Sequence, residues 1–123
     1  MDIITTIECC VTNEAPFYLW DSLNNHTKVY ELRLAQPNTK WATLLGEKPA
    51  TGLNVLNPQT GHILNMKITS IRVFDTFSGA LQTLGYLNCI PTATDFEKAR
   101  SVYTKYFPKG EQGNKVVAIG LAV

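Results

Sequence analysis

The residues best equipped for chemistry lie in one short segment, residues 28–34, with the sequence KVYELRL. Polar and apolar residues alternate here, which predicts a β-strand whose successive side chains point to opposite faces. Glu31 and Arg33 are two positions apart, so their side chains emerge side by side. Arginine offers a planar fork of donors that suits a phosphate or a base edge, whereas glutamate can accept from an exocyclic amine or act as a general base. Lys28 adds a mobile positive charge at the start of the strand.

Lys28, Glu31 and Arg33 together form a cation–carboxylate–cation trio that suits a nucleotide. The apolar residues of the strand belong to the core, so the trio is expected to line a cleft between the sheet and a short helix predicted at residues 17–23. The alternative interpretation is an exposed glutamate–arginine pair on a solvated strand face, because surface ion pairs are common and contribute little.

The two tryptophans are the natural stacking partners for a base, because base–aromatic stacking contributes about 1–3 kcal/mol per base. Trp20 lies on the amphipathic helix at residues 17–23, where core packing is the alternative role. Trp41 lies in a polar loop, residues 35–52, and loops carry function more often than cores do. Its alternative role is to anchor that loop. The predicted ligand-binding residues are therefore Lys28, Glu31, Arg33, Trp20 and Trp41.

Other kinds of site find less support in the sequence. Four cations in or near the last predicted helix can follow a phosphate backbone, although a solvated helix face is the alternative. These are Lys98, Arg100, Lys105 and Lys109. His26 and His62 have no companion ligands at metal-binding spacing and Cys9-Cys10 is not a CxxC pair, so no metal is predicted. No cofactor is predicted, because the sequence has no phosphate-binding glycine loop, dinucleotide fingerprint or Gly-x-Ser-x-Gly elbow.

The elements that position these residues follow from turn signals and hydrophobic periodicity. Strands are predicted at residues 3–11, 28–34, 53–57, 63–74 and 115–123, and helices at residues 17–23, 76–84 and 95–107, with one helical turn at 41–45. This order predicts an α+β fold, a small, mostly antiparallel β-barrel with about three flanking helices. The predicted core includes Leu32, Leu34, Ile68, Ile71, Val117 and Ile119.

Length and composition predict one globular domain over residues 1–123, with 45% hydrophobic and 17% charged residues. No apolar run approaches the ~18 residues of a membrane span, and the first residues lack the features of a signal peptide.

Three cysteines make a poor disulfide framework, so reduced thiols are expected in an intracellular compartment, the cytoplasm, with the nucleus left open. A net charge of +1 argues against a broad grip on duplex nucleic acid but allows a pocket for one or two nucleotides.

Taken in order, several segments resemble the ASCH family, a branch of the PUA-like β-barrels. The family pattern runs from a Gly-x-Lys-Thr-x-Glu-x-Arg-like strand through a Phe-x-x-x-Leu helix and a tyrosine-bearing helix to a Gly-Val-x-Ala-Ile strand. Here its pieces are KVYELR at 28–33, IRVF at 71–74, FSGAL at 77–81, IP at 90–91, VYTKY at 102–106 and VAIGL at 117–121. The resemblance spans nearly the whole chain. It implies a PUA-like barrel whose cleft binds RNA or a nucleotide.

The chain departs from the family near the predicted cleft, where the glycine before the lysine is missing and Val29 replaces the usual threonine. One branch of the family hydrolyses acetylcytidine with a lysine, a threonine nucleophile and a distal glutamate. The resemblance puts Lys28 at that lysine and Glu31 at that threonine, and residues 84–90 contain no acid. A carboxylate cannot replace an alcohol nucleophile in the same scheme. Binding is therefore the expected function. The alternative is a hydrolase, acting on acetylcytidine or as a ribonuclease, in which Lys28 and Glu31 are catalytic.

Overall fold

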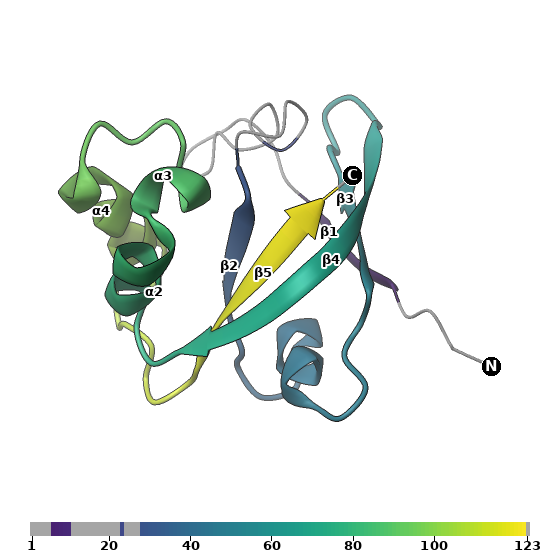
Figure 1. Cartoon of the computed structure of the whole chain (residues 1–123), viewed down its shortest axis with the longest axis horizontal. Helices are drawn as coiled ribbons and strands as arrows, with labels where there is room; N and C mark the ends of the chain where they lie inside the picture. Colours follow the sequence, from purple (N-terminus) through teal and green to yellow (C-terminus); the bar gives the residue numbers. More distant parts are fainter. Residues whose placement is uncertain (1–5, 11–22, 24–27, 123) are drawn as a thin grey trace.

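The computed structural model describes residues 6–10, 23 and 28–122, which form an α+β fold (Figure 1). The strands are β1 (Thr6–Cys10), β2 (Tyr30–Leu34), β3 (Gly52–Leu56), β4 (Ile63–Phe74) and β5 (Val116–Ala122). The described helices are the 3-10 helix η1 (Lys40–Leu45) and the α-helices α2 (Phe77–Leu84), α3 (Tyr86–Cys89) and α4 (Phe96–Tyr106). None of the helices in this described part is long and apolar enough to cross a membrane.

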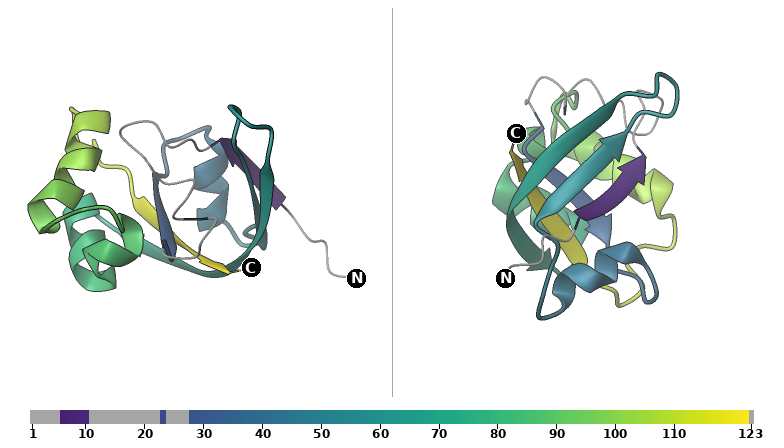
Figure 2. Two further views of the ribbon diagram at one scale, coloured as in Figure 1. Left: turned by 90° about the horizontal axis from the view of Figure 1, so that it is seen from above. Right: turned by 90° about the vertical axis from the view of Figure 1, so that its right-hand side faces the viewer.

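The strands form one sheet in the order β1-β3-β4-β5-β2, which curls into a half-barrel (Figure 2). The pairs β3–β4, β4–β5 and β5–β2 are antiparallel, but β1 and β3 are parallel. The predicted α+β class is therefore confirmed, whereas the described sheet is mixed and open between its edge strands, β1 and β2. The parallel pair arises because the chain between β1 and β3 is long enough to return in the same direction.

The helices lie in two places around the sheet. Figure 1 shows α2, α3 and α4 gathered on one side, next to β2, while η1 crosses the lower end of the half-barrel. The side chain of Thr76 accepts a 2.9 Å hydrogen bond from Gly79 N at the start of α2, and Gly85 ends that helix with a φ of +87°. A threonine N-cap and a glycine after the last turn are common boundary signals of an α-helix. The short helix α3 was not predicted, because four residues show no helical period.

The core prediction is confirmed for four of its residues and wrong for two. Leu32, Leu34, Val117 and Ile119 are buried, whereas Ile68 and Ile71 are half-buried. Both isoleucines pack against the core without being enclosed by it, because most side chains of β4 are exposed or half-buried. The register shift between Ile68 and Ser70 places Ile68 opposite Leu121 and Ile71 opposite Ile119, so these two residues share one face although they are three positions apart. The final strand, β5, is buried on both faces, as is usual for a strand with a continuous apolar sequence.

Candidate functional site: a buried charged cluster beside β2

The backbone around Lys28 is fixed on both sides before β2 begins. Val29 N donates to Asn88 O at the end of α3, and Val29 O accepts from Leu121 N in β5, each over 2.9 Å. These two bonds tie the residue before β2 to α3 on one side and to β5 on the other. They also bring the Lys28 side chain to the carbonyl of Cys89, which accepts a hydrogen bond from Lys28 Nζ.

Lys28 is almost wholly buried, with 1% of its surface exposed. Burial lowers the pKa of its ammonium group, and the nearby carboxylate of Glu31 offsets part of that effect. A buried lysine is uncommon, because removing an ammonium ion from water is costly unless the charge is paired. Lys28 is therefore part of an interior charge cluster and is not the solvated lysine that its sequence position allows.

Glu31 and Arg33 share one face of β2, as their spacing predicted. Arg33 Nε lies 3.4 Å from Glu31 Oε1, and the two side chains are 22% and 3% exposed. At this distance the two opposite charges form an ion pair, but the two atoms are too far apart for a good hydrogen bond. Burial opposes the charge of Arg33, but the Glu31 carboxylate and the nearby groups of Cys9, Tyr106 and Tyr103 together outweigh it, so the pKa of Arg33 is raised. Because Glu31 is buried, the alternative interpretation of a solvated surface pair is wrong.

The second carboxylate oxygen of Glu31 has no internal partner. Among the described residues, neither Glu31 Oε2 nor Arg33 Nε has a hydrogen-bond partner, although both atoms are buried. Buried polar groups are nearly always paired, and an unpaired one costs about 1–3 kcal/mol, more when it is charged. The cluster thus presents one unused acceptor and one unused donor side by side.

Trp41 joins this cluster from η1. The guanidinium carbon of Arg33 lies 4.7 Å from the centre of the Trp41 ring, within the range of a cation–π contact. Lys40 approaches the same ring at 5.9 Å and donates to the backbone carbonyl of Glu8 in β1. Trp41 packs against both the core and Arg33, which fits its alternative role as a loop anchor, while its stacking on a base stays a prediction.

Sequence reasoning missed two neighbours of the cluster, Cys89 and Tyr103, which come from α3 and α4. Cys89 is a free, buried cysteine, and burial raises the pKa of its thiol to about 11. Burial raises the pKa of the Tyr103 hydroxyl well above its ordinary value, and the charge of Glu31 raises it further. No local pattern links either residue to β2, since each follows it by more than fifty positions.

The structure does not describe the predicted stacking residue Trp20, and it places Arg100, one of the four predicted cations, on the surface. Trp20 lies outside the described residues, and of the helix predicted at residues 17–23 only Leu23 is described, as a fully buried residue. A cleft against that helix therefore stays a prediction. Arg100 pairs with Glu97 at 2.8 Å on the exposed face of α4. Within the described ranges, no group of three or more histidine, cysteine or acidic residues could hold a metal ion.

The raised pKa of Cys89 predicts slow alkylation. A shift from 9.0 to about 11 lowers the thiolate fraction near neutral pH by roughly 100-fold. Iodoacetamide at pH 8 should therefore modify Cys89 roughly 100-fold more slowly in the folded chain than in urea, as followed by mass spectrometry of the tryptic peptide 73–98. Equal rates in the two states would contradict the buried, neutral thiol.

Comparisons with known proteins identify the fold and no family. No family model matches the chain, and no curated protein matches it. The crystal structure of hypothetical protein PH0355 has a TM-score of 0.70 at 21% sequence identity, over 95% of this chain and 97% of that one. The solution structure of protein PF0455 from Pyrococcus furiosus has a TM-score of 0.66 at 20% identity, over 95% and 96% of the two chains. At this identity the likeness shows a shared α+β fold alone.

Proposed function

We propose that the chain is a PUA-like module of ASCH type whose cluster of Lys28, Glu31, Arg33 and Trp41 binds RNA or a nucleotide. The sequence resemblance at residues 28–33 supports this proposal, because it covers three of the four residues in the cluster. The curled half-barrel is compatible with a PUA-like fold.

The observation that carries the proposal is the unpaired oxygen of Glu31. Its side chain is 3% exposed, and Oε2 has no hydrogen-bond partner in the described part of the chain. An N–H group of a base edge would satisfy that oxygen, while the donors of Arg33 beside it match a carbonyl oxygen, ring nitrogen or phosphate. Base edges present such donors and acceptors next to each other, and proteins that bind single-stranded RNA recognise them in this way.

Charge balance favours a ligand that brings an anion. Lys28 and Arg33 contribute two positive charges and Glu31 contributes one negative charge, so these three residues sum to +1. Glu31 is also the one described carboxylate whose charge acts on Lys28. A largely buried cation without a full counter-charge is costly, and a phosphate group would lower that cost. A nucleotide combines this phosphate with a base edge.

Trp41 supplies a stacking platform together with Arg33. The guanidinium group already lies over the indole ring at 4.7 Å, so a base that enters beside Glu31 meets the arginine plane or the remaining ring surface. RNA-binding proteins stack bases on aromatic rings and on arginine planes alike. The pair therefore gives affinity without strong base preference, whereas Glu31 gives the preference.

The proposal predicts that the shape of Arg33 matters as well as its charge. Arg33→Lys keeps the charge but removes the planar fork and its contact with Trp41, so affinity for nucleoside monophosphates or single-stranded RNA should fall by about tenfold or more. Fluorescence anisotropy with labelled RNA, and calorimetry with the four monophosphates, measure this effect. The matched control is Arg72→Lys, which changes an exposed arginine over Phe74 on β4 and should leave affinity within about twofold. Equal losses in the two variants would contradict the assignment of Arg33.

A hydrolase is the second candidate function, favoured by the lowered pKa of Lys28. A lysine that loses its proton more readily can serve as a general base or a nucleophile. Two features argue against it. The resemblance puts Glu31 at the position of the nucleophilic threonine. The distal glutamate is expected at residues 84–90, where Cys89 has a thiol with a raised pKa. Scoring the same ligands, together with acetylcytidine, for product release distinguishes the two functions, because a binding module returns every ligand unchanged.

A further inference from the structure

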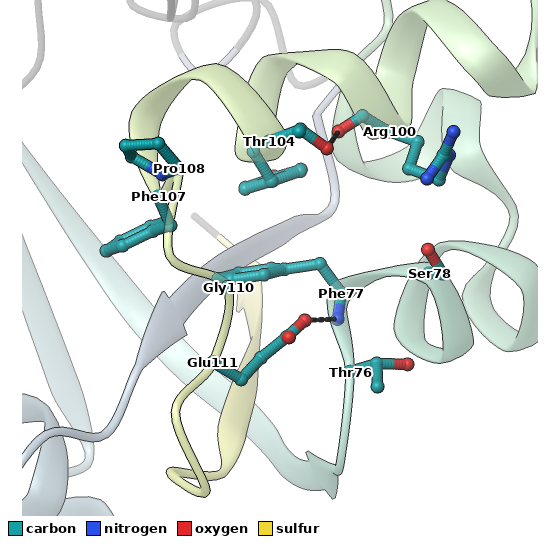
Figure 3. A pocket seen from close by; sticks show the side chains of 10 residues that line it. Thr76, Phe77, Ser78, Arg100, Thr104, Phe107, Pro108, Gly110 and Glu111 are labelled. Carbon is teal, nitrogen blue, oxygen red and sulfur yellow. Dashed lines mark hydrogen bonds between the residues drawn. The ribbon is translucent and has the colours of Figure 1, made fainter.

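A second concave site lies beside Tyr103, a residue that is also close to the charged cluster. It is a pocket of about 270 Å³ between α2, α4 and the turn that follows α4 (Figure 3). Arg100 and Thr104 line it from α4, and Thr76 and Ser78 line it from the start of α2. This volume is close to the lower end of the range for small-molecule pockets, which suits one base or nucleoside better than a large ligand.

The inner wall of the pocket is aromatic. The rings of Phe77 and Tyr103 are stacked with their centroids 4.5 Å apart and their planes at 9°, and Phe107 stacks on Phe77 at 5.3 Å and 17°. Phe77, Tyr103 and Phe107 all line the pocket, whose rim carries hydroxyl and charged groups. An apolar ring surface with a few polar groups around it is the usual composition of a site for a base or nucleoside.

The charged groups of the pocket lie on different sides of Phe77. Figure 3 shows the Arg100 guanidinium near Ser78 on one side and the Glu111 carboxylate on the other. Glu111 Oε1 accepts a 2.9 Å hydrogen bond from Phe77 N, which fixes the carboxylate in place. A bare phosphate would meet repulsion from Glu111. A nucleotide can instead direct its phosphate to Arg100 and an N–H group of its base to Glu111. The phosphate then shares the guanidinium with Glu97, whose carboxylate accepts from Arg100 Nε and Nη2.

Tyr103 links this pocket to the charged cluster. Its side chain is 2% exposed and forms part of the pocket wall. The same side chain lies close enough to Glu31 and Arg33 for their charges to act on its hydroxyl. Tyr103 is therefore a neighbour of both sites.

We propose that the pocket beside Arg100 is a second nucleotide subsite, so that the ligand is a single-stranded oligonucleotide and not a free mononucleotide. This inference rests on the proposed function of the Lys28–Glu31–Arg33 cluster. One nucleotide occupies the cluster, and a neighbouring nucleotide places its base in the pocket and its phosphate on Arg100. The chain then recognises an unpaired segment of RNA of at least two nucleotides, as modules that bind single strands do.

The test compares ligands of two lengths on matched variants. The probes are the four nucleoside 5′-monophosphates and a mixed-sequence RNA hexamer, and the variants are Arg100→Ala and Lys98→Ala. Both substitutions remove one exposed cation from α4, but Lys98 does not line the pocket. We expect Arg100→Ala to weaken hexamer binding by about tenfold and to reduce the slope of log K against log salt by about 0.7, because one phosphate contact is lost. Monophosphate binding should stay within about twofold, and Lys98→Ala should change neither ligand by more than that.

Three outcomes would overturn the inference. If the hexamer binds no tighter than the monophosphates, the second subsite is wrong while the proposed function stands. If Arg100→Ala and Lys98→Ala weaken the hexamer equally, with the same salt slopes, the effect is general charge attraction and the pocket is not a subsite. If the parent chain binds neither ligand, both the inference and the proposed function are wrong. Thermal melting of each variant confirms that it remains folded.

Discussion

Replacement of Glu31 by glutamine should lower the free energy of unfolding by about 3–5 kcal/mol, because it leaves Lys28 and Arg33 as interior cations without their carboxylate. Glutamine keeps the size of the side chain, so packing changes little. The effect comes from burial, since Glu31 is 2% exposed and Lys28 is 1% exposed. Urea denaturation of the parent and the variant measures it.

A double-mutant cycle separates this charge effect from a general loss of stability. Lys28→Met removes one of the two cations, so Glu31→Gln should cost less in that background than in the parent, with a coupling of about 0.5–3 kcal/mol. The control is Glu97→Gln, which breaks an exposed pair with Arg100 on α4 and should cost below about 1 kcal/mol. If Glu31→Gln costs no more than Glu97→Gln, the interior charge cluster is wrong.

Truncation of Ile119 to alanine should lower the free energy of unfolding by about 2–5 kcal/mol, because it opens a cavity in the middle of the sheet. Ile119 is fully buried on β5, where it pairs with Glu31 of β2 on one side and with Ile71 of β4 on the other. The matched control is Val73→Ala on β4, where the valine is 48% exposed. Its cost should stay below about 1 kcal/mol in the same denaturant titration. A cost for Ile119→Ala as small as that of the control would show that the register of β5 is wrong.

The sequence predicted most of the elements but not how the strands pair in the sheet. The bounds of β4 and α2 follow from hydrophobic runs, the Thr76 cap and the Gly85 stop, all of which are local signals. The parallel pairing of β1 with β3 is not local, because it depends on the path of more than forty intervening residues. The bulge between Ile68 and Ser70 is also invisible in the sequence, since the residues before and after it look like one uninterrupted strand.

The pairing of Glu31 with Arg33 was predictable from the sequence, but the environment of the pair was not. Alternation along β2 indicates that Glu31 and Arg33 share a face, and the structure agrees. Alternation cannot show that this face is covered, because the cover comes from α3 and α4, distant in sequence. Lys28 lies before the strand begins, so its position depends on the hydrogen bond between Val29 N and Asn88 O and not on strand parity.

The central claim is that Glu31 and Arg33 receive a nucleotide, and an NMR titration tests it most directly. The four nucleoside 5′-monophosphates are added to the labelled chain while the backbone amides, the arginine Nε–H groups and the indole N–H groups are followed. We predict saturable shifts at Glu31, Arg33 and the Trp41 indole for at least one monophosphate, because Arg33 Nε gains a hydrogen-bond partner that it lacks in the described structure. Saturable shifts confined to residues away from β2 and η1, or no shifts at all at millimolar ligand, would contradict it.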